Sequence, residues 1–341
     1  MDNFRLFIAI VLIAFINSCT TYYYVVTDVD NDLNVERRIY ASSDDASKVS
    51  FPVEAGSSWK VSSLDVPFVV DFYDMSDEMT HMAECRGLDM DAVSLGLNGG
   101  DDPVLSPDES VDRRFRWFYT YYDYRAVFSS LRDRLPLSFD GYLTDKQQAL
   151  FFVGDDPPEG WNGIEMYYLL DDICQNFARW HSDATYDVMC EIFIPFCTDE
   201  QAAVLDTVKE RFMEGLEREA LFAMQPDEFD DRMAMIVPDV GFGKIYDRNP
   251  EAVDKAYESE TEIIGCFENT FLFAMNMPGK YIDGNAQELI DGIPSWKVDA
   301  FRLLYGDMVL EATSRTVNLW AFILTFAVIA ILLQVFAKGL F

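Results

Sequence analysis

The longest apolar stretch of the chain lies near its C-terminal end. Residues 319–336 read LWAFILTFAVIAILLQVF, eighteen residues without a charge. At about 1.5 Å per residue, a helix of this length reaches roughly 27 Å, and its apolar flanks extend it to the ~30 Å of a bilayer's hydrocarbon. Trp320 stands where an interfacial aromatic belongs, and Lys338 can reach the far surface. The pattern predicts a transmembrane helix over residues 317–337, with a buried helix of a soluble protein as the alternative.

A second apolar stretch, of signal-peptide length, lies at the other end. Arg5 precedes the run from Leu6 to Ile16, and Asn17, Ser18 and Cys19 follow. An apolar core of eleven residues behind a basic residue is typical of a secretory signal. We therefore expect residues 1–18 to be a cleaved signal peptide, with an uncleaved N-terminal anchor as the alternative.

The tetrad Ile16-Asn17-Ser18-Cys19 resembles the lipobox of bacterial lipoproteins, with an aliphatic residue three positions before the cysteine and a small one directly before it. That resemblance implies a diacylated Cys19 at the start of the mature chain. A chain led by a signal is translocated until the C-terminal helix stops it, so the part between should lie outside the cytoplasm. If the cell has two membranes, a helical span favours the inner one.

After the signal, apolar and polar residues alternate with a period of two, which is typical of strands. The pattern predicts a hairpin over residues 22–41, strands over 59–63 and 66–73, a short helix from Ser76 to about Cys85, and a surface loop over 87–112. The stretch FRWFYTYYDY at 115–124 is apolar on both faces. It predicts a central strand covered on both sides, with an aromatic wall for a sugar or peptide as the alternative.

From residue 131 the apolar residues recur every three or four positions, which indicates helices. Capping residues place the beginnings of several of them. The expected helices cover 144–152, the stretch from 164 through Trp180, 198–223, 227–236 and 250–264. From residue 266 the period returns to two, with strands over 271–275, 293–298 and 308–313.

Together these patterns predict an α+β fold. Residues 19–130 and 266–316 form a membrane-proximal β-domain, and residues 131–265 form an inserted helical domain. A lipid at Cys19 and a span near residue 319 would hold both chain ends at one membrane, so strands from the two ends are natural sheet neighbours.

The chain is strongly acidic, with 26 basic against 59 acidic residues and a net charge of −33. Half of its residues are hydrophobic, so this charge does not indicate disorder. Such a surface should repel nucleic acid and anionic lipid. It is either a solvated acidic surface or one that attracts cations or a basic partner.

Candidate chemistry is sparse, and we predict no catalytic, cofactor-binding or metal-binding residues. Sequence signatures of hydrolases, zinc proteases and nucleotide-binding loops are absent. His81 and His181 could act as a pair only if the fold unites them. The spacing of Asp28, Asp30 and Asp32 resembles a calcium loop but lacks its glycine, and residues 241–244 read as a turn.

Acidic pairs are too numerous for any two to be singled out as the acid and base of a hydrolase. They include Asp155/Asp156, Asp171/Asp172 and Asp230/Asp231. Besides Cys19 there are five cysteines, which we expect to be mostly reduced; a bridge between Cys190 and Cys197 is the alternative.

Several segments resemble uncharacterised bacterial anchored lipoproteins. Met277 to Lys280, Asn285, Trp296 to Val298 and Arg315 to Asn318 resemble their membrane-proximal β-region, and the hairpin end Arg38 to Ala41 and the stretch at 115–124 are similar to the same group. The resemblance implies an architecture and no activity. We therefore expect a non-enzymatic, membrane-anchored interaction or scaffold protein of the cell envelope, with an envelope protein as partner. The alternative is an extracytoplasmic hydrolase that uses carboxylates in a cleft between the two domains.

Overall fold

The computed structural model describes residues 21–42, 51, 53, 58–72, 75–96, 106–153, 163–216, 224–265 and 269–339, and it confirms the α+β class. Two compact units result. The β unit comprises Thr20–Ser129, Asn269–Ala300 and Asp307–Phe341; the described part of the helical unit lies within Ser130–Glu268 and Phe301–Gly306. Phe301–Gly306 belongs to the helical unit, although its place between two strands suggests the β-domain.

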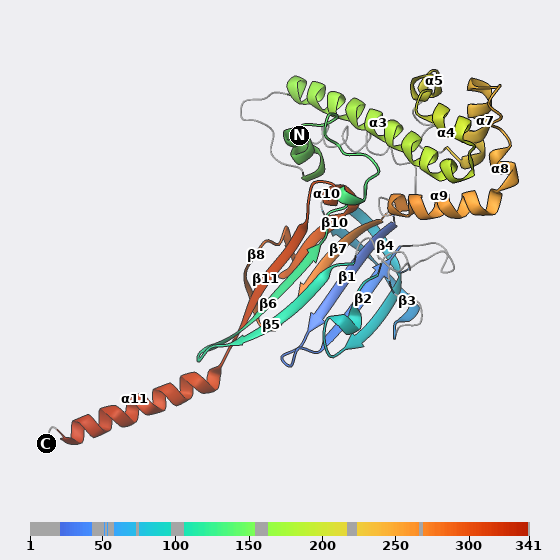
Figure 1. The fold of residues 1–341 in the computed structure, drawn as a ribbon. Coiled ribbons are helices and arrows are strands. Elements are labelled where there is room, and N and C mark those ends of the chain that lie inside the picture. The colour runs from blue at the N-terminus through green and yellow to red at the C-terminus, as the bar shows by residue number, and fades with distance from the viewer. Residues whose placement is uncertain are drawn as a thin grey trace. The chain divides into compact units, whose positions relative to one another are not determined.

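The larger sheet of the β unit joins strands from both ends of the chain. Within the described residues its order is β3-β4-β2-β1-β7-β10-β9 (Figure 1). β1 and β7 pair in parallel, and the other pairs are antiparallel. The strands are β1 Thr21–Val29, β2 Val35–Ala41, β3 Lys60–Phe72, β4 Met75–Gly87, β7 Asn269–Asn276, β9 Glu288–Ile290 and β10 Ile293–Asp299.

The smaller sheet has the order β5-β6-β11-β8 and is antiparallel. Its strands are β5 Asp108–Phe115, β6 Tyr119–Phe128, β8 Lys280–Gly284 and β11 Met308–Val317. One face of β6 packs on the larger sheet, where Tyr124 meets Trp296 at 6.1 Å and Phe128 meets Phe273 at 5.2 Å between ring centroids. The predicted pairing of the first and last parts of the chain therefore holds in both sheets.

The predicted helix from Ser76 to Cys85 is wrong, because this segment is strand β4. Met79, His81 and Ala83 are buried, and Thr80 and Met82 between them are more exposed, which is the alternation of a strand. β4 pairs with β2 on one side and with β3 on the other. These long-range hydrogen bonds outweigh the local helix-start signal. The two strands predicted over 59–73 are likewise a single strand, β3, with one irregularity.

The aromatic stretch at 115–124 is a hairpin tip rather than a single central strand. β5 ends at Phe115 and β6 begins at Tyr119, and the Arg116 N–H donates to the Tyr119 carbonyl at 2.8 Å. Phe115 and Trp117 are 59% and 45% exposed. The surface loop predicted over 87–112 is also partly wrong, since it contains the start of β5 and the 3-10 turn Asp91–Val93.

The helical unit follows its predicted capping signals. Thr144 and Thr198 each form a capping box, before α2 and α4. Its core includes Tyr186, Phe212 and Phe229. The elements are η3 Arg132–Arg134, α2 Asp145–Gln148, η4 Ala149–Val153, α3 Gly163–Phe193, η5 Ile194–Phe196, α4 Asp199–Leu205, α5 Lys209–Met213, α7 Pro226–Ile236, α8 Ile245–Arg248, α9 Pro250–Gly265 and α10 Ala300–Leu303.

The single helix predicted over 198–223 is wrong, because α4 and α5 are separate helices and residues 217–223 lie outside the described chain. The break follows Leu205. There the Thr207 N–H and hydroxyl both bond to the Val204 carbonyl at 2.9 Å, which tightens the last turn and ends α4.

Candidate membrane-interface site

The C-terminal helix α11, Leu319–Gly339, is apolar around its whole circumference. It extends about 31 Å at 1.5 Å per residue, and its only basic residue is Lys338. Its large apolar side chains are open to the surroundings; Ile323 is 70% exposed and Phe326 74%. A core helix of a soluble protein would be covered, so α11 is compatible with a membrane-spanning helix.

Asn318 is the single residue between β11 and α11, and it is tied on several sides to the β5–β6 hairpin. Its N–H donates to the Phe118 carbonyl at 2.9 Å, and its Nδ2 donates to the Arg116 carbonyl at 2.8 Å. Its Oδ1 accepts from the Thr120 hydroxyl at 3.0 Å, and its carbonyl accepts from the Ala321 N–H at 2.9 Å. The helix therefore leaves the β unit from a braced residue.

The hairpin tip packs its aromatic rings on the first turns of α11. Trp117 meets Trp320 edge-on at 5.3 Å, and Phe118 meets Phe322 at 4.5 Å. The Trp117 indole N–H donates to the Thr325 hydroxyl at 2.8 Å, so the tip reaches the second turn of the helix. Further ring contacts join Phe115 to Trp320 and Tyr119 to Phe322. Rings of this kind favour the membrane–water interface, where Trp and Tyr combine apolar area with a polar group.

Trp320 is predictable from the sequence as an interfacial residue, but its partners are not. The partners stand some 200 positions earlier in the chain, and nothing local connects them to the helix. The usable signal was Arg116 itself, a charge near the start of the aromatic stretch at 115–124, which fits a turn better than a strand covered on both faces. Cys19, the predicted lipidation residue, and the signal segment 1–18 lie outside the described residues.

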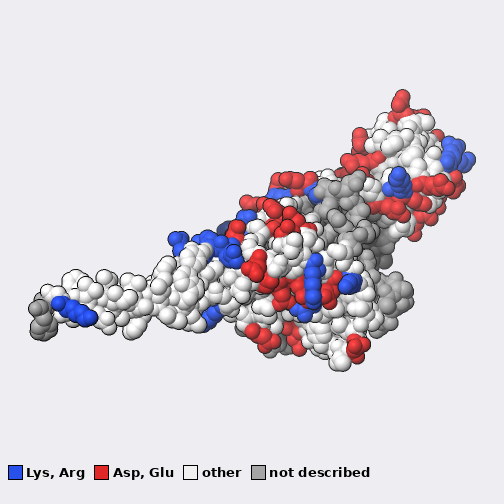
Figure 2. Space-filling model, turned by 90° about the horizontal axis from the view of Figure 1, so that it is seen from below, with Lys and Arg blue, Asp and Glu red and all other residues white. Residues whose placement is uncertain are grey.

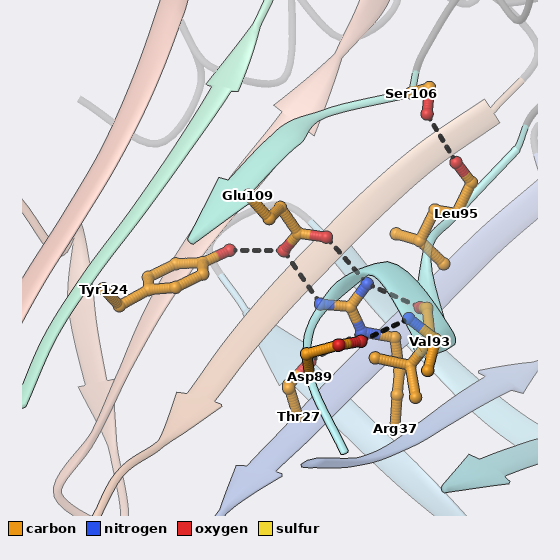
Figure 3. Close-up of polar contacts among 9 residues, drawn as sticks. Thr27, Arg37, Asp89, Val93, Leu95, Ser106, Glu109 and Tyr124 are labelled. Carbon is orange, nitrogen blue, oxygen red and sulfur yellow. Dashed lines mark hydrogen bonds and ion pairs between the residues drawn. The ribbon is translucent and has the colours of Figure 1, made fainter. Parts of the chain in front are cut away.

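A second polar cluster, centred on Arg37, lies between the two sheets of the β unit (Figure 3). The Nη1 and Nη2 atoms of Arg37 each donate to Glu109 at 2.8 Å, and its Nε donates to the Thr27 hydroxyl at 2.8 Å. Nη1 also donates to the Val93 carbonyl at 3.0 Å, and the Tyr124 hydroxyl donates to Glu109 at 2.8 Å. The Arg37 side chain has no exposed surface, and that of Glu109 is 4% exposed.

The pKa values in this cluster fit a structural cross-link. Burial disfavours the charge of Arg37, but the charge and hydrogen bonds of Glu109, with smaller contributions from Tyr124 and Cys85, outweigh it, so the pKa of Arg37 is raised. Burial, and then the same carboxylate, raise the pKa of Tyr124 well above its usual value. A hollow of about 240 Å³ borders Glu109, but that carboxylate already accepts three hydrogen bonds. The cluster therefore ties β2 to β5 and is poorly suited to act on a ligand.

The other predicted candidates have structural partners. His81 lies on β4 in the β unit and shares a 2.8 Å contact with Thr80; His181 lies on α3 in the helical unit, where burial lowers its pKa to about 4. The Asp30 carboxylate accepts the N–H groups of Asp32 and Asn34 and closes the β1–β2 turn. Such bonds are those of a turn rather than of a calcium loop.

The acidic pairs also serve local structure. Asp230 accepts three backbone N–H groups, from Gly243, Ile245 and Tyr246, at 2.7, 2.7 and 2.9 Å. It thereby braces the predicted turn at 241–244. Asp171 accepts a hydrogen bond from Gln175 one turn further along α3, and Asp172 accepts one from Gln147 of α2. Asp155/Asp156 lie outside the described residues. Within the described chain, no three His, Cys, Asp or Glu side chains gather as a metal site.

The carboxyl groups whose pKa values are shifted have lowered pKa values, which is the opposite of what acid catalysis needs. Hydrogen bonding from Asn34 lowers the pKa of Asp30, and hydrogen bonding from Arg114 lowers that of Asp123. A hydrolase acid needs a raised pKa to hold its proton near neutral pH. Cys85, Cys174, Cys190 and Cys197 are free thiols, so the alternative bridge between Cys190 and Cys197 is absent from the structure. Cys266 lies outside the described residues.

Comparisons of the chain with protein-family models, with curated proteins and with solved structures find no match. The candidate site therefore has to be interpreted from its own geometry. That geometry supports an anchoring role, because the contacts between the hairpin tip and α11 join the β unit to the apolar helix.

Proposed function

We propose that the protein is anchored in a membrane by α11 and that its two globular units lie outside the cytoplasm. The observation that carries this proposal is the packing of the hairpin tip on the first turns of α11. A helix joined by a loose linker would leave the β unit free to move. Asn318 and the ring of Trp117 instead fix the helix to the β unit where an interfacial belt belongs.

The extracytoplasmic side is supported by the sequence. Residues 1–18 have the length and order of a secretory signal, and Cys19 has a lipobox-like context. A lipid at Cys19 would add a second attachment, although one acylated cysteine binds a membrane far more weakly than a spanning helix. In a cell with two membranes, the units would face the periplasm from the inner membrane.

Within the envelope, we propose a non-enzymatic interaction or scaffold role. The polar clusters at Arg37 and Asp230 use their bonds to hold the fold. The helical unit lies in the sequence between the two parts of the β unit, and we propose that it is the part that meets an envelope protein. Its acidic character suits a basic partner and disfavours nucleic acid.

The test is the protection of a tag placed after Phe341, in spheroplasts treated with an added protease. We expect the protease to digest both units and to leave the tag intact. In Ile329→Arg/Leu332→Arg, α11 should no longer stop translocation, because each central arginine costs about 2.5–3.5 kcal/mol. The tag should then be degraded.

The matched control is Tyr168→Arg/Met235→Arg. It adds the same charge at two apolar positions of the helical unit that are 67% and 74% exposed. Its tag should stay protected. Globular units that resist the protease in intact spheroplasts would refute the extracytoplasmic location. A tag that stays protected in the α11 variant would refute the span.

A further inference from the structure

A row of basic side chains crosses the smaller sheet just before α11. Arg114 pairs with Tyr121, Tyr121 pairs with Arg315, and Arg315 pairs with Lys280. Directly opposite residues in antiparallel strands share one face of the sheet. Arg114, Arg315 and Lys280 therefore point to the same side, away from the face of β6 that packs on the larger sheet, and all three are exposed. We call these three residues the basic row.

Two of the three charges are uncompensated. Arg114 donates to the Asp123 carboxylate at 2.7 Å. Arg315 lies over the ring of Tyr119, with 4.7 Å between its guanidinium carbon and the ring centroid. Within the described part of the chain, neither Arg315 nor Lys280 lies within ion-pair distance of a carboxylate, in contrast to Arg125 with Glu311 on the same face. Unpaired cations side by side are unexpected in a chain with a net charge of −33.

With α11 in a bilayer, the basic row lies within about one Debye length, about 8 Å, of the lipid headgroup layer. Arg315 stands four residues before Leu319, roughly 13 Å along a strand that rises about 3.3 Å per residue. Headgroups occupy roughly the first 5–8 Å beyond the hydrocarbon on each side of a bilayer. With Leu319 at the edge of the hydrocarbon, the backbone at Arg315 therefore lies about 5–8 Å beyond the headgroups. That gap is within the Debye length of about 8 Å. Figure 2 shows blue side chains gathered beside the place where α11 leaves the β unit.

We propose that the basic row binds the phosphate groups of anionic phospholipids in the adjoining leaflet. The inference rests on the proposed function, because only a spanning α11 holds the row at a membrane surface. The net charge still predicts that most of the surface is repelled by anionic lipid. Attraction at the row and repulsion elsewhere would together set the orientation of the β unit, with its acidic surfaces turned from the bilayer.

The test uses the full chain in a neutral detergent, supplied with equal amounts of phosphatidylglycerol and phosphatidylcholine. Native mass spectrometry measures the ratio of the two lipids retained. We expect wild type to retain more phosphatidylglycerol. Lys280→Gln/Arg315→Gln should lower the ratio by up to about fivefold for each cation removed, and added salt should weaken the wild-type preference.

The matched control is Arg86→Gln/Arg125→Gln, which removes two exposed cations that have carboxylate partners. Its lipid ratio should equal that of wild type. Lys280→Gln alone, at an exposed position, keeps the test valid if the double variant misfolds. Equal retention of both lipids by wild type would overturn the inference, as would an unchanged ratio in the double variant.

Failure of the proposed function would look different. Reconstitution into vesicles of phosphatidylcholine alone depends on α11 and not on the basic row. Wild type and the double variant should both float with such vesicles. Flotation without a preference for phosphatidylglycerol refutes the lipid site only, whereas the absence of flotation refutes the span.

Discussion

Replacing Glu109 with glutamine should destabilise the β unit far more than its small change in shape suggests. The Arg37 guanidinium is fully buried, and Glu109 is its only charged partner among the described residues. Glu109→Gln keeps the volume but removes the negative charge, and its amide would direct N–H groups toward a donor. Breaking a buried pair from one side costs about 3–5 kcal/mol.

Hydrogen exchange followed by mass spectrometry can localise this loss. Peptides from β2 and β5 should exchange about a hundredfold faster or more, which corresponds to about 3 kcal/mol. Peptides from α3, in the helical unit, should be unchanged and serve as an internal reference. Glu311→Gln is the matched control, because its 3.4 Å pair with Arg125 is more than half exposed. It should cost less than about 1 kcal/mol.

The triple variant Arg37→Met/Glu109→Met/Tyr124→Phe tests whether the cost of Glu109→Gln comes from the buried charge left on Arg37 or from the loss of the contact itself. It removes both charges and the hydroxyl bonded to them, and leaves Thr27 and Val93 each without one partner. Unpaired polar groups of this kind cost about 1–3 kcal/mol each, but replacing a whole buried ion pair by apolar side chains is often neutral or stabilising by about 1–4 kcal/mol, which offsets that cost. The triple variant should therefore be more stable than Glu109→Gln. The reasoning is refuted if the single variant exchanges like wild type, or if the triple variant is the least stable.

Three further predictions concern single sites. Trp117→Ala should speed hydrogen exchange in the β5–β6 hairpin of the protein in detergent. Trp117→Phe should have a smaller effect, because it keeps a ring against Trp320 and loses only the hydrogen bond to Thr325. The helical unit should lose about 3 kcal/mol of stability as pH falls from 6.5 toward 4. Burial holds the pKa of His181 at about 4 in the folded protein, so the unfolded chain takes up the proton first as the pH falls. Urea unfolding at several pH values checks this, and His181→Gln should flatten the dependence. In thermal unfolding, Gly279→Ala should destabilise the β unit more than Gly292→Ala. Both glycines have a positive φ, but only a Cβ at position 279 would lie 2.1 Å from a β11 carbonyl oxygen.

The parts of the fold that the sequence predicted correctly depend on local signals. Thr144 and Thr198 form the capping boxes that their spacing indicates, and α3 follows its apolar stripe. The β1–β2 hairpin follows from alternation and the turn around Asp30. In each case the decisive contacts join residues close in sequence, so the pattern contains the information.

The errors have the opposite origin. Ser76 followed by acidic residues resembles a helix start, yet β2 and β3 hold this segment as a strand through hydrogen bonds to residues far away. The burial of Arg37 has no local signal in the sequence, because its partner Glu109 is 72 positions away. Trp117 and Thr325 are 208 positions apart. No periodicity in a single sequence records such pairs, so the candidate site could be predicted only as far as the apolar helix itself.

The arrangement of charge explains how one chain can be both strongly acidic and suited to a membrane surface. Net charge describes the average surface, which is repelled by anionic lipid. Near the bilayer, however, electrostatic interactions act over about one Debye length, so only the last few residues before α11 contribute strongly. In that short segment the exposed charges on β11 and β8 are Arg315 and Lys280. The next acidic positions lie further from the helix: Asp283 on β8 pairs with Thr313, two residues before Arg315, and Glu311 on β11 is four residues before it. Local placement, rather than composition, therefore decides how the β unit meets the membrane.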